Sequence, residues 1–370
     1  MPFGTKFLLL LVAGISCAAV SCGRSHASNA MDRSLLLKAV REYGRTSEAV
    51  SGATTESKVP VAALIDNEGE YRSQVAAFLV QKDFGQLEQL ARDARVGKTR
   101  FAGGIWKLNA FYQATSEPIV PGANDADWEF LIATLKEWAE VRPNSVTPRV
   151  ALADTYVKYA DKARGGGYAD TVSETGWKLD DQRLQLAAST LLEAARLKEK
   201  CPFWYEVMQQ VALGQGWSKP EARELFDRAT AFEPSFYHYY REYANFLQPK
   251  WYGEPGEAEA LADDAYTRVP GPEGKFIYFE IASLLTCQCD SDDSDMQNLS
   301  WPKIQEGYTA LGQLYGYSVL KRNRYAHMAV EARDKRAAAA TFAAIGDDWD
   351  HEVWRSDQQF EQAKNWALSN

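Results

Sequence analysis

Apolar residues recur at spacings of three and four along most of the chain, and this period constrains the fold more than any other feature. Four runs show it most clearly: Trp128–Ala139, Leu184–Ala195, Ala222–Ala229 and Tyr240–Leu247. Residues at these spacings share one face of an α-helix, and a neighbouring helix must cover that face. From Tyr71 onward, no segment shows the alternation of a strand. The sequence therefore predicts an all-α protein whose helices are joined by short turns.

Small residues, aromatic residues and prolines indicate that the helices repeat. One segment carries them at intervals of 4, 3 and 5, as in the second helix of the tetratricopeptide (TPR) repeat: Ala222, Phe226, Ala229 and Pro234. Small residues let two helices approach, the ring fills the gap, and proline ends the helix. Pro202 and Pro270 lie 32 and 36 residues from Pro234, on either side of the TPR period of about 34 residues. We therefore expect a TPR-like helical repeat array, an α-solenoid with degenerate repeats; a bundle without repeats is the alternative.

The N-terminal segment predicts export from a bacterial cytoplasm. Residues 7–20 are almost all apolar and follow a single lysine, which is typical of a secretory signal. The sequence Ala-Val-Ser-Cys at 19–22 resembles the lipoprotein box, in which Cys22 becomes the lipid-attached first residue. Because Gly23 rather than Asp follows, this resemblance implies a periplasmic protein anchored by lipid to the outer membrane. Cleavage after Ala27 is the alternative, and it would release a soluble secreted protein.

Changes in composition divide the chain into five predicted parts. They are a signal peptide with its lipobox (1–22), a flexible tether (23–60), a TPR-like helical repeat domain (61–289), an acidic loop (290–300) and a C-terminal helical segment (301–370). The tether is rich in Ser, Ala, Thr and Glu, which bury little apolar surface, and it contains one predicted helix around Leu35–Tyr43. We expect a Gly-bearing loop at Arg164–Lys178 and helical pairs around Phe78–Glu88 and Asn323–Ile345.

One segment resembles a known family more closely than the general repeat does. Phe246–Gly256, which contains the letters PKWYGEPG, is similar to the hallmark of an uncharacterised bacterial family of TPR-like domains. Arg164-Gly165 and the residues Trp301, Tyr308 and Tyr315-Gly316 fit the same pattern, so the resemblance covers residues 60–360. Members are domains of unknown function in secreted and lipid-anchored proteins. The resemblance therefore implies a fold and no activity.

Motifs of nucleotide binding and nucleophilic catalysis are absent from the sequence. Gly97-Lys98-Thr99 lacks the first glycine of a P-loop, which would fall at Arg92, and neither G-x-S-x-G nor H-E-x-x-H occurs. We expect His238 to face solvent or an aromatic ring and His327 to be packed. The sequence thus predicts no catalytic residue, no cofactor and no enzymatic activity. An envelope enzyme that cleaves glycans with a Glu general acid is the remaining catalytic alternative.

Acidic residues and cysteines do not form a recognisable metal site. An EF-hand loop beginning at Asp290 would need Gly and Glu where the chain has Asp295 and Trp301. No second pair of Cys or His completes a tetrahedral set with Cys287 and Cys289, so we predict no metal. In an exported protein Cys201 could pair with either of these two cysteines, and buried free thiols are the alternative.

The surplus of aromatic residues is the remaining functional signal. Rings exposed on the concave face of a solenoid make a binding surface, and the candidate groove aromatics are Tyr239, Tyr243, Trp251 and Tyr252. The net charge of −9 argues against nucleic acid as a partner. We therefore predict a protein–protein interaction scaffold of the bacterial cell envelope, which binds an unknown protein or peptide and touches the membrane only through its lipid anchor. A glycan- or small-ligand-binding envelope protein is the alternative.

Overall fold

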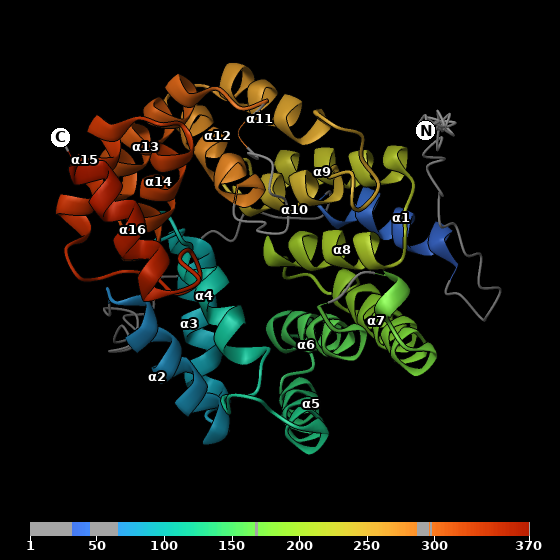
Figure 1. The fold of residues 1–370 in the computed structure, drawn as a ribbon. Helices are drawn as coiled ribbons and strands as arrows, with labels where there is room; N and C mark the ends of the chain where they lie inside the picture. The colour runs from blue at the N-terminus through green and yellow to red at the C-terminus, as the bar shows by residue number, and fades with distance from the viewer. Residues whose placement is uncertain (1–31, 45–65, 167–168, 287–295, 297, 370) are drawn as a thin grey trace, which may run out of the picture. The chain divides into compact units, whose positions relative to one another are not determined.

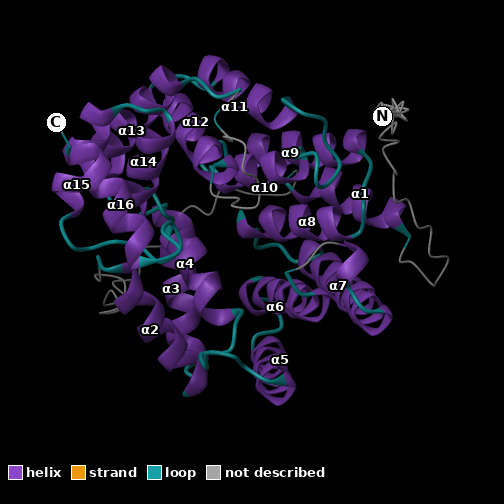
Figure 2. Ribbon diagram, in the orientation of Figure 1, coloured by secondary structure: helices purple, strands orange, loops and turns teal. Residues whose placement is uncertain are grey.

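The predicted all-α class is confirmed. A computed structural model describes residues 32–44, 66–166, 169–286, 296 and 298–369, all within one compact unit, Met31–Asn370. These residues form α-helices joined by loops, together with a short 3-10 helix at Ala169–Thr171 (Figures 1 and 2). The helices are α1 Arg33–Tyr43, α2 Glu68–Val80, α3 Phe84–Gly97, α4 Lys107–Thr115, α5 Asp125–Val141, α6 Thr147–Arg164, α7 Glu174–Ala195, α8 Phe203–Gly214, α9 Lys219–Phe232, α10 His238–Phe246, α11 Glu257–Arg268, α12 Pro272–Leu285, α13 Trp301–Tyr315, α14 Val319–Glu331, α15 Lys335–Ile345 and α16 Asp357–Leu368.

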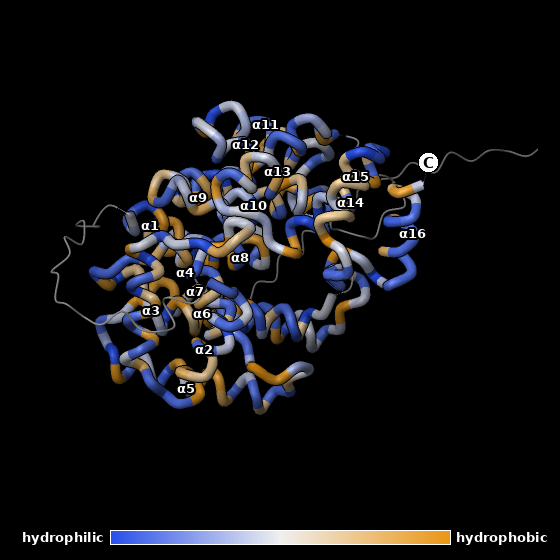
Figure 3. The backbone as a smooth tube through the Cα atoms, turned by 90° about the vertical axis from the view of Figure 1, so that its left-hand side faces the viewer, coloured by the Kyte–Doolittle hydropathy of each residue, from blue (hydrophilic) through white to orange (hydrophobic). Residues whose placement is uncertain are grey.

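The even-numbered helices form one continuous layer. Each of them from α2 to α14 contacts the next even-numbered helix along the chain. The odd-numbered helices α3 to α15 lie against this layer through their sequence neighbours. Figure 3 shows hydrophilic and hydrophobic residues interleaved along the helices, as expected for elements with one covered face. We call the set α2, α4, α6, α8, α10, α12, α14 and α16 the even layer.

The helical pair predicted around Phe78–Glu88 is confirmed as α2 and α3. Lys82 takes a left-handed conformation (φ 55°), and the Asp83 side chain then accepts a hydrogen bond from the Gln86 N–H at 3.1 Å. This turn ends one helix with a left-handed residue and starts the next with an acidic cap. Helices α14 and α15 are joined in the same way through Arg333 (φ 56°) and Asp334, so the second predicted pair is also confirmed.

Helix α7 begins earlier than predicted. We expected a loop over Arg164–Lys178, but α7 starts at Glu174, where the Ser173 hydroxyl accepts a hydrogen bond from the Gly176 N–H at 3.0 Å. A side chain on Gly176 would lie 2.8 Å from the carbonyl oxygen of Ala163, so glycine permits the close approach to α6. The loop between α6 and α7 is therefore shorter than its composition indicated.

Part of the predicted flexible tether is a packed helix. Helix α1 buries Leu36, Val40 and Tyr43, and it contacts α7 and α9. The Tyr43 ring stacks on Trp204 with centroids 4.0 Å apart, and the Arg41 guanidinium donates two hydrogen bonds to the Glu224 carboxylate at 2.7 and 2.8 Å. The helix predicted around Leu35–Tyr43 is thus confirmed as α1, but it is packed against the domain rather than part of a flexible tether, because its apolar face finds a partner. The rest of 23–60 lies outside the described residues.

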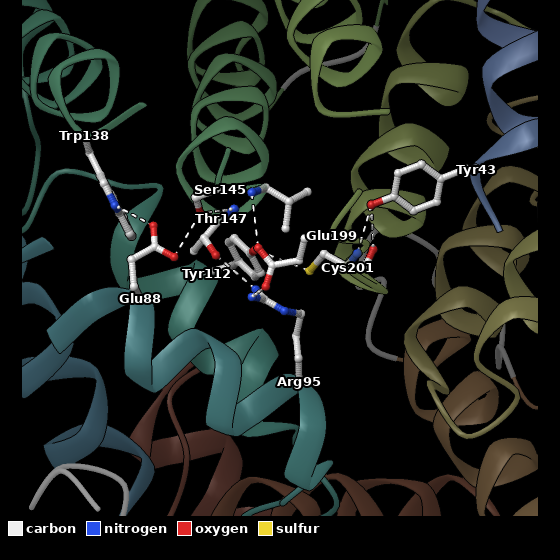
Figure 4. A network of polar contacts seen from close by, with 10 residues as sticks. Tyr43, Glu88, Arg95, Tyr112, Trp138, Ser145, Thr147, Glu199 and Cys201 are labelled. Atoms are coloured by element: carbon white, nitrogen blue, oxygen red, sulfur yellow. Dashed lines mark hydrogen bonds and ion pairs between the residues drawn. The ribbon is translucent and has the colours of Figure 1, made fainter. Parts of the chain in front are cut away.

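A buried polar network ties the N-terminal helices to the loop before α8 (Figure 4). Glu88 on α3 accepts hydrogen bonds from the Trp138 indole and the Ser145 hydroxyl, both at 2.9 Å. On the same helix Arg95 donates to the Thr147 hydroxyl at 3.0 Å and pairs with Glu199. The Tyr43 hydroxyl accepts a hydrogen bond from the backbone N–H of Cys201 at 2.9 Å. These contacts are internally satisfied, which indicates a structural role.

The loop between α3 and α4 joins the beginning of the even layer to its end. The N–H of Gly103 donates to the Gly316 carbonyl oxygen at 3.1 Å, and the Arg100 guanidinium lies over the rings of Trp106 and Tyr315, 4.7 and 4.5 Å from their centroids. The loop thus contacts the segment between α13 and α14. Through it, the layer closes back on its own first helices.

The hydrophobic core does not follow the predicted division at residue 301. Ile304 and Leu311 of α13 belong to the same cluster as the buried residues of α1 to α12. A second cluster begins only in α14 and surrounds Phe342, Trp354 and Phe360. The acidic loop predicted at 290–300 lies mostly outside the described residues.

No helix of the described residues is long and apolar enough to cross a bilayer. The predicted signal peptide, Cys22 and the Ala27 cleavage site lie outside those residues, so export and lipid attachment stay predictions.

Candidate functional site

Two of the four predicted groove aromatics lie in the core. Tyr239 is fully buried and its hydroxyl donates a hydrogen bond to the Pro202 carbonyl oxygen at 2.8 Å. Tyr243 is 6% exposed and stacks on Phe226 with centroids 4.7 Å apart. The prediction that these two rings line a groove is wrong, because they occupy the face of α10 that packs on neighbouring helices.

The other two predicted aromatics lie in the turn after α10. The Tyr252 side chain is 37% exposed, whereas Trp251 is half-buried. The turn itself requires glycine, because a Cβ on Gly253 would lie 1.7 Å from the Leu247 carbonyl oxygen. Two segments that the sequence analysis singled out separately meet here: the Arg164 guanidinium lies over the Trp251 ring, 5.1 Å from its centroid. We therefore place both segments at one site.

Arg164 is held between two indole rings. Besides Trp251, it lies over the ring of Trp177 on α7, 5.6 Å from the centroid. Such cation–π contacts fix a guanidinium without neutralising its charge. Arg164 thus presents a positive charge at the end of α6, next to the acidic residues described below.

Five carboxylates form an acidic cluster centred on the even layer. Its members are Asp154 and Asp161 on α6, Asp180 on α7, Glu206 on α8 and Glu242 on α10. The negative charge of at least one other member raises the pKa of each carboxyl except Asp154. The sequence analysis missed this cluster. Its only signal was the helical spacing of Asp154, Lys158 and Asp161, which reads equally well as a solvated face.

Glu206 is deeply buried and has no cation in contact. It is 5% exposed, and the Asn109 amide nitrogen lies 3.1 and 3.2 Å from its two oxygens as hydrogen-bond donor. Burial raises the pKa of Glu206 well above its usual range, and the Glu242 charge adds to this effect. The protein interior therefore favours the protonated form of this carboxyl.

His238 faces Glu206 without a hydrogen bond. Its Nδ1 atom lies 3.8 Å from Glu206 Oε1, and its ring stacks on Tyr237 with centroids 4.3 Å apart. Burial holds the pKa of His238 well below its usual range, and the positive charge of Arg241 lowers it further. The imidazole is therefore uncharged at neutral pH. It contacts an aromatic ring, one of the two environments expected for it.

Four members of the acidic cluster have no basic partner. In the described part of the chain, no Lys or Arg nitrogen lies within 4 Å of Asp161, Asp180, Glu206 or Glu242, whereas Asp154 pairs with Lys158 at 3.1 Å. Desolvation raises the pKa of Asp161 and of Asp180 to about 6 and that of Glu242 to about 7. The positive charges of Arg164, which acts on Asp161 and Asp180, and of Arg241, which acts on Glu242, offset this desolvation only in part, because they lie beyond 4 Å.

A neighbouring ionic group on the even layer is balanced. Glu280 on α12 is 1% exposed and lies 2.6 Å from the Lys321 ammonium on α14. The Arg241 guanidinium on α10 lies 3.2 Å from the same carboxylate and also donates to the Glu280 carbonyl oxygen at 2.8 Å. Burial lowers the pKa of Lys321 to about 8. We call these three residues the Glu280 triad.

Hydrogen-bond acceptors near the acidic cluster are left unpaired. The Oδ1 atom of Asn109 and the Oε1 atom of Gln209 are buried without a hydrogen-bond partner, although Asn109 is only 2% and Gln209 only 6% exposed. Buried acceptor atoms ordinarily accept a hydrogen bond from the protein or from water, so these two atoms are exceptions. The Nε2 atom of His238 beside Glu206 is likewise buried without a hydrogen-bond partner, so both donors and acceptors are left unpaired here.

Metal and cysteine chemistry receive no support. The described residues contain no group of three or more His, Cys, Asp or Glu side chains that could hold a metal ion. Cys201 is a buried free thiol, with its sulfur 3.3 Å from the Tyr112 hydroxyl oxygen. Cys287, Cys289 and Asp290–Asp295 lie outside the described residues. His327 packs against Trp354 as expected, with ring centroids 5.3 Å apart.

Comparison with models of known protein families and with curated proteins finds no match. The resemblance of Phe246–Gly256 to a family of TPR-like domains therefore stays a prediction.

Proposed function

We propose that this protein is a TPR-like binding scaffold of the bacterial cell envelope, without catalytic activity, which holds a protein or peptide partner against its even layer. The observation that carries the proposal is the placement of the acidic cluster. It draws four of its five members from α6, α8 and α10, which are even-numbered helices that contact one another in sequence. A continuous layer bearing charged side chains is the arrangement that helical-repeat proteins use to bind extended partners.

A recurring turn supports the repeat part of the proposal. Between α8 and α9, Gly216 is left-handed (φ 63°), and the N–H of Trp217 donates to the Ala212 carbonyl oxygen at 2.9 Å. The α2–α3 and α14–α15 turns form the same bond five residues back, from Asp83 to Phe78 and from Asp334 to Ala329, each at 2.9 Å. One turn type at three places is expected of degenerate repeats.

The burial of the residues with TPR spacing also supports the repeat part of the proposal. Ala222 and Ala229 on α9 are 4% and 0% exposed, and Phe226 beside them is 5% exposed. Small buried residues on one helix face permit the close helix packing of an α-solenoid. Pro234 follows the end of α9 at Phe232.

The scarcity of exposed apolar side chains on the even layer indicates which kind of partner it could bind. Among the described residues, the large exposed apolar side chains on this layer lie at helix ends, namely Val80, Val319 and Leu368. An amphipathic helix needs an apolar groove, so the even layer suits a polar or charged segment better. The alternative, a glycan or small-ligand binder, draws its support from Trp251 and Tyr252, which retain exposed surface beside carboxylates and Arg164.

Site-specific photo-crosslinking of the full-length protein in its native envelope tests the proposal. A photoreactive residue replaces Gln210, which is half-buried on α8 beside Glu242, and in a matched control it replaces Glu193, which is exposed on α7. We expect one specific protein to crosslink from position 210 and not from position 193. Crosslinks from position 193 alone, or none from either, would refute a partner held on the even layer. Glycan recovered at position 210 in place of protein would favour the alternative.

Mass spectrometry of the same preparation tests the predicted export and lipid attachment. We expect a diacylated or triacylated Cys22 at the mature N-terminus. An N-terminus following Ala27 would contradict the anchor and leave the scaffold proposal untouched.

A further inference from the structure

We propose that a cavity beside the loop between α3 and α4 binds a small zwitterion, a molecule with a free carboxylate, a free ammonium group and an apolar side chain. A free amino acid and a dipeptide are the two sources of this chemistry. The inference goes beyond the proposed function, because it concerns a different site and requires no partner on the even layer.

The cavity has a volume of about 500 Å³ and lies where four segments meet: the α3–α4 loop, the α9–α10 loop, the beginning of α12 and the end of α13. This volume falls in the range of roughly 300–1,000 Å³ that ligand pockets have. Two cationic, one acidic and three large apolar or aromatic residues line it, namely Lys98, Arg100, Glu273, Phe101, Leu314 and Tyr315. A lining with charges of both signs and apolar surface suits a ligand of the same mixed character.

Backbone hydrogen bonds hold the α3–α4 loop in the conformation that forms one wall of the cavity. The N–H of Phe101 donates to the Ile105 carbonyl oxygen at 2.8 Å, and the N–H of Lys107 donates to the Thr99 carbonyl oxygen at 2.9 Å. This wall is therefore formed before a ligand arrives, which lowers the entropic cost of binding.

Arg100 supplies a positive charge that is fixed in position and has no carboxylate beside it. Its guanidinium lies over the Trp106 and Tyr315 rings, and it donates hydrogen bonds to the Tyr315 hydroxyl and to the Ser235 carbonyl oxygen, the latter at 2.7 Å. No carboxylate oxygen of the described residues lies within 4 Å of this guanidinium. A guanidinium has five N–H donors, so Arg100 can still donate to the carboxylate of a ligand.

The other cation of the lining is already paired. The Lys98 ammonium lies 2.6 Å from a carboxylate oxygen of Glu233, whose side chain is 9% exposed. Burial lowers the pKa of Arg100, and the negative charges of Glu233 and Glu273 offset this effect only in part. Arg100 is therefore the cation of the lining whose charge is less compensated.

Glu273 supplies the negative charge. It is the acidic residue in the first turn of α12, where the helix dipole favours a carboxylate, and it is half-buried. Over the described ranges of the chain, no Lys or Arg nitrogen lies within 4 Å of its carboxylate. Because Arg100 and Glu273 line one cavity without forming an ion pair with each other, a ligand can place its carboxylate at Arg100 and its ammonium at Glu273.

A zwitterion matches this lining better than a simple ion does. An anion at Arg100 would be repelled by Glu273, and a cation at Glu273 would be repelled by Arg100, since both residues line the same cavity. Phe101, Leu314 and Tyr315 add apolar surface, against which an apolar side chain is favourably buried.

Isothermal titration calorimetry of the full chain tests the inference with two probes, L-leucine and L-leucyl-L-leucine. Acetylation of the amino group removes the positive charge of a probe, amidation of the carboxyl group removes its negative charge, and glycine lacks the apolar side chain of leucine. We expect each of these three changes to weaken binding about tenfold. Tighter binding of the dipeptide than of leucine would identify a peptide as the source, and the reverse order would identify a free amino acid.

Substitutions of two matched glutamates locate the site. Glu273→Gln should weaken binding of the zwitterion about tenfold, and it should not weaken binding of the acetylated form, which has no ammonium to lose its partner. Glu174→Gln is the control, because Glu174 also lies in the first turn of a helix, α7, but does not line the cavity. This variant should bind with unchanged affinity.

A third substitution tests the other end of the ligand. Arg100→Lys keeps the positive charge but loses the planar pair of donors, so it should weaken binding of the zwitterion and of its acetylated form alike. Its thermal unfolding is measured in parallel, since Arg100 also holds the α3–α4 loop against α13.

No binding of either zwitterion, equal binding of the modified and unmodified probes, or wild-type affinity of the Glu273→Gln variant would overturn the inference. None of these outcomes changes the crosslink expected from position 210, so the scaffold proposal is tested separately.

Discussion

The acidic cluster and the Glu280 triad lie side by side on the even layer, since Arg241 belongs to the triad and the next residue, Glu242, to the cluster. Both contain a nearly fully buried glutamate, Glu206 at 5% and Glu280 at 1% exposure. Glu280 is met by an ammonium and a guanidinium, at 2.6 and 3.2 Å. Glu206 is met by an uncharged amide and an uncharged imidazole. The difference teaches that two glutamates with similar burial can have opposite electrostatic surroundings, because the groups that face a carboxylate decide whether its charge is balanced.

The same substitution should therefore have opposite effects at the two sites, beginning with the larger. Glu280→Gln leaves the buried Lys321 and Arg241 without their counter-ion, and should lower the free energy of unfolding by about 3 kcal/mol. Urea denaturation at neutral pH measures this change. A variant as stable as the wild type would show that the Glu280 triad is not a balanced structural group.

Glu206→Gln should stabilise the protein by about 2 kcal/mol at about pH 8. The pKa of Glu206 is raised in the folded state, so its contribution to stability is fully present below the unfolded pKa and is lost as pH rises through the folded pKa. Glutamine cannot ionise, so the variant does not lose this stability at high pH, and its side chain has nearly the shape of glutamate. Denaturation at about pH 4 serves as the control, since the two proteins should then be equally stable.

Glu242→Gln should stabilise less, by about 1 kcal/mol, because Glu242 is partly exposed and solvent screens its charge. Burial raises the pKa of Glu242 to about 7 in the folded protein. The stability of the variant relative to the wild type should therefore increase from the unfolded pKa up to about pH 7 and stay constant above it. A gain that grew only above pH 8 would place the perturbed carboxyl elsewhere. Glu140→Gln, which removes an exposed carboxylate on α5, is the control and should leave the free energy of unfolding unchanged at every pH.

Much of the fold could be predicted from local sequence, and the acidic cluster could not. Periodic apolar residues predicted α5, α7, α9 and α10, because an amphipathic face is a short-range pattern. The turn at Lys82–Asp83 was predictable for the same reason. Helix α1 was also predicted, but its packing was not, since its partner Trp204 lies far along the chain.

The candidate site depends on contacts that no single segment contains. Asn109, Glu206 and His238 come from α4, α8 and α10, and each is unremarkable within its own helix. Tyr239 and Tyr243 misled the sequence analysis because aromatic residues serve core and groove alike, and only packing separates the two roles. By contrast, Arg164 and Trp251 were both singled out, but their contact could be seen only in three dimensions.

The crosslinking experiment in the native envelope tests the central claim most directly, that the even layer holds a partner. We predict that one specific protein crosslinks from position 210 on α8 and that none crosslinks from position 193 on α7. Crosslinks from position 193 alone, or from neither position, would contradict the account.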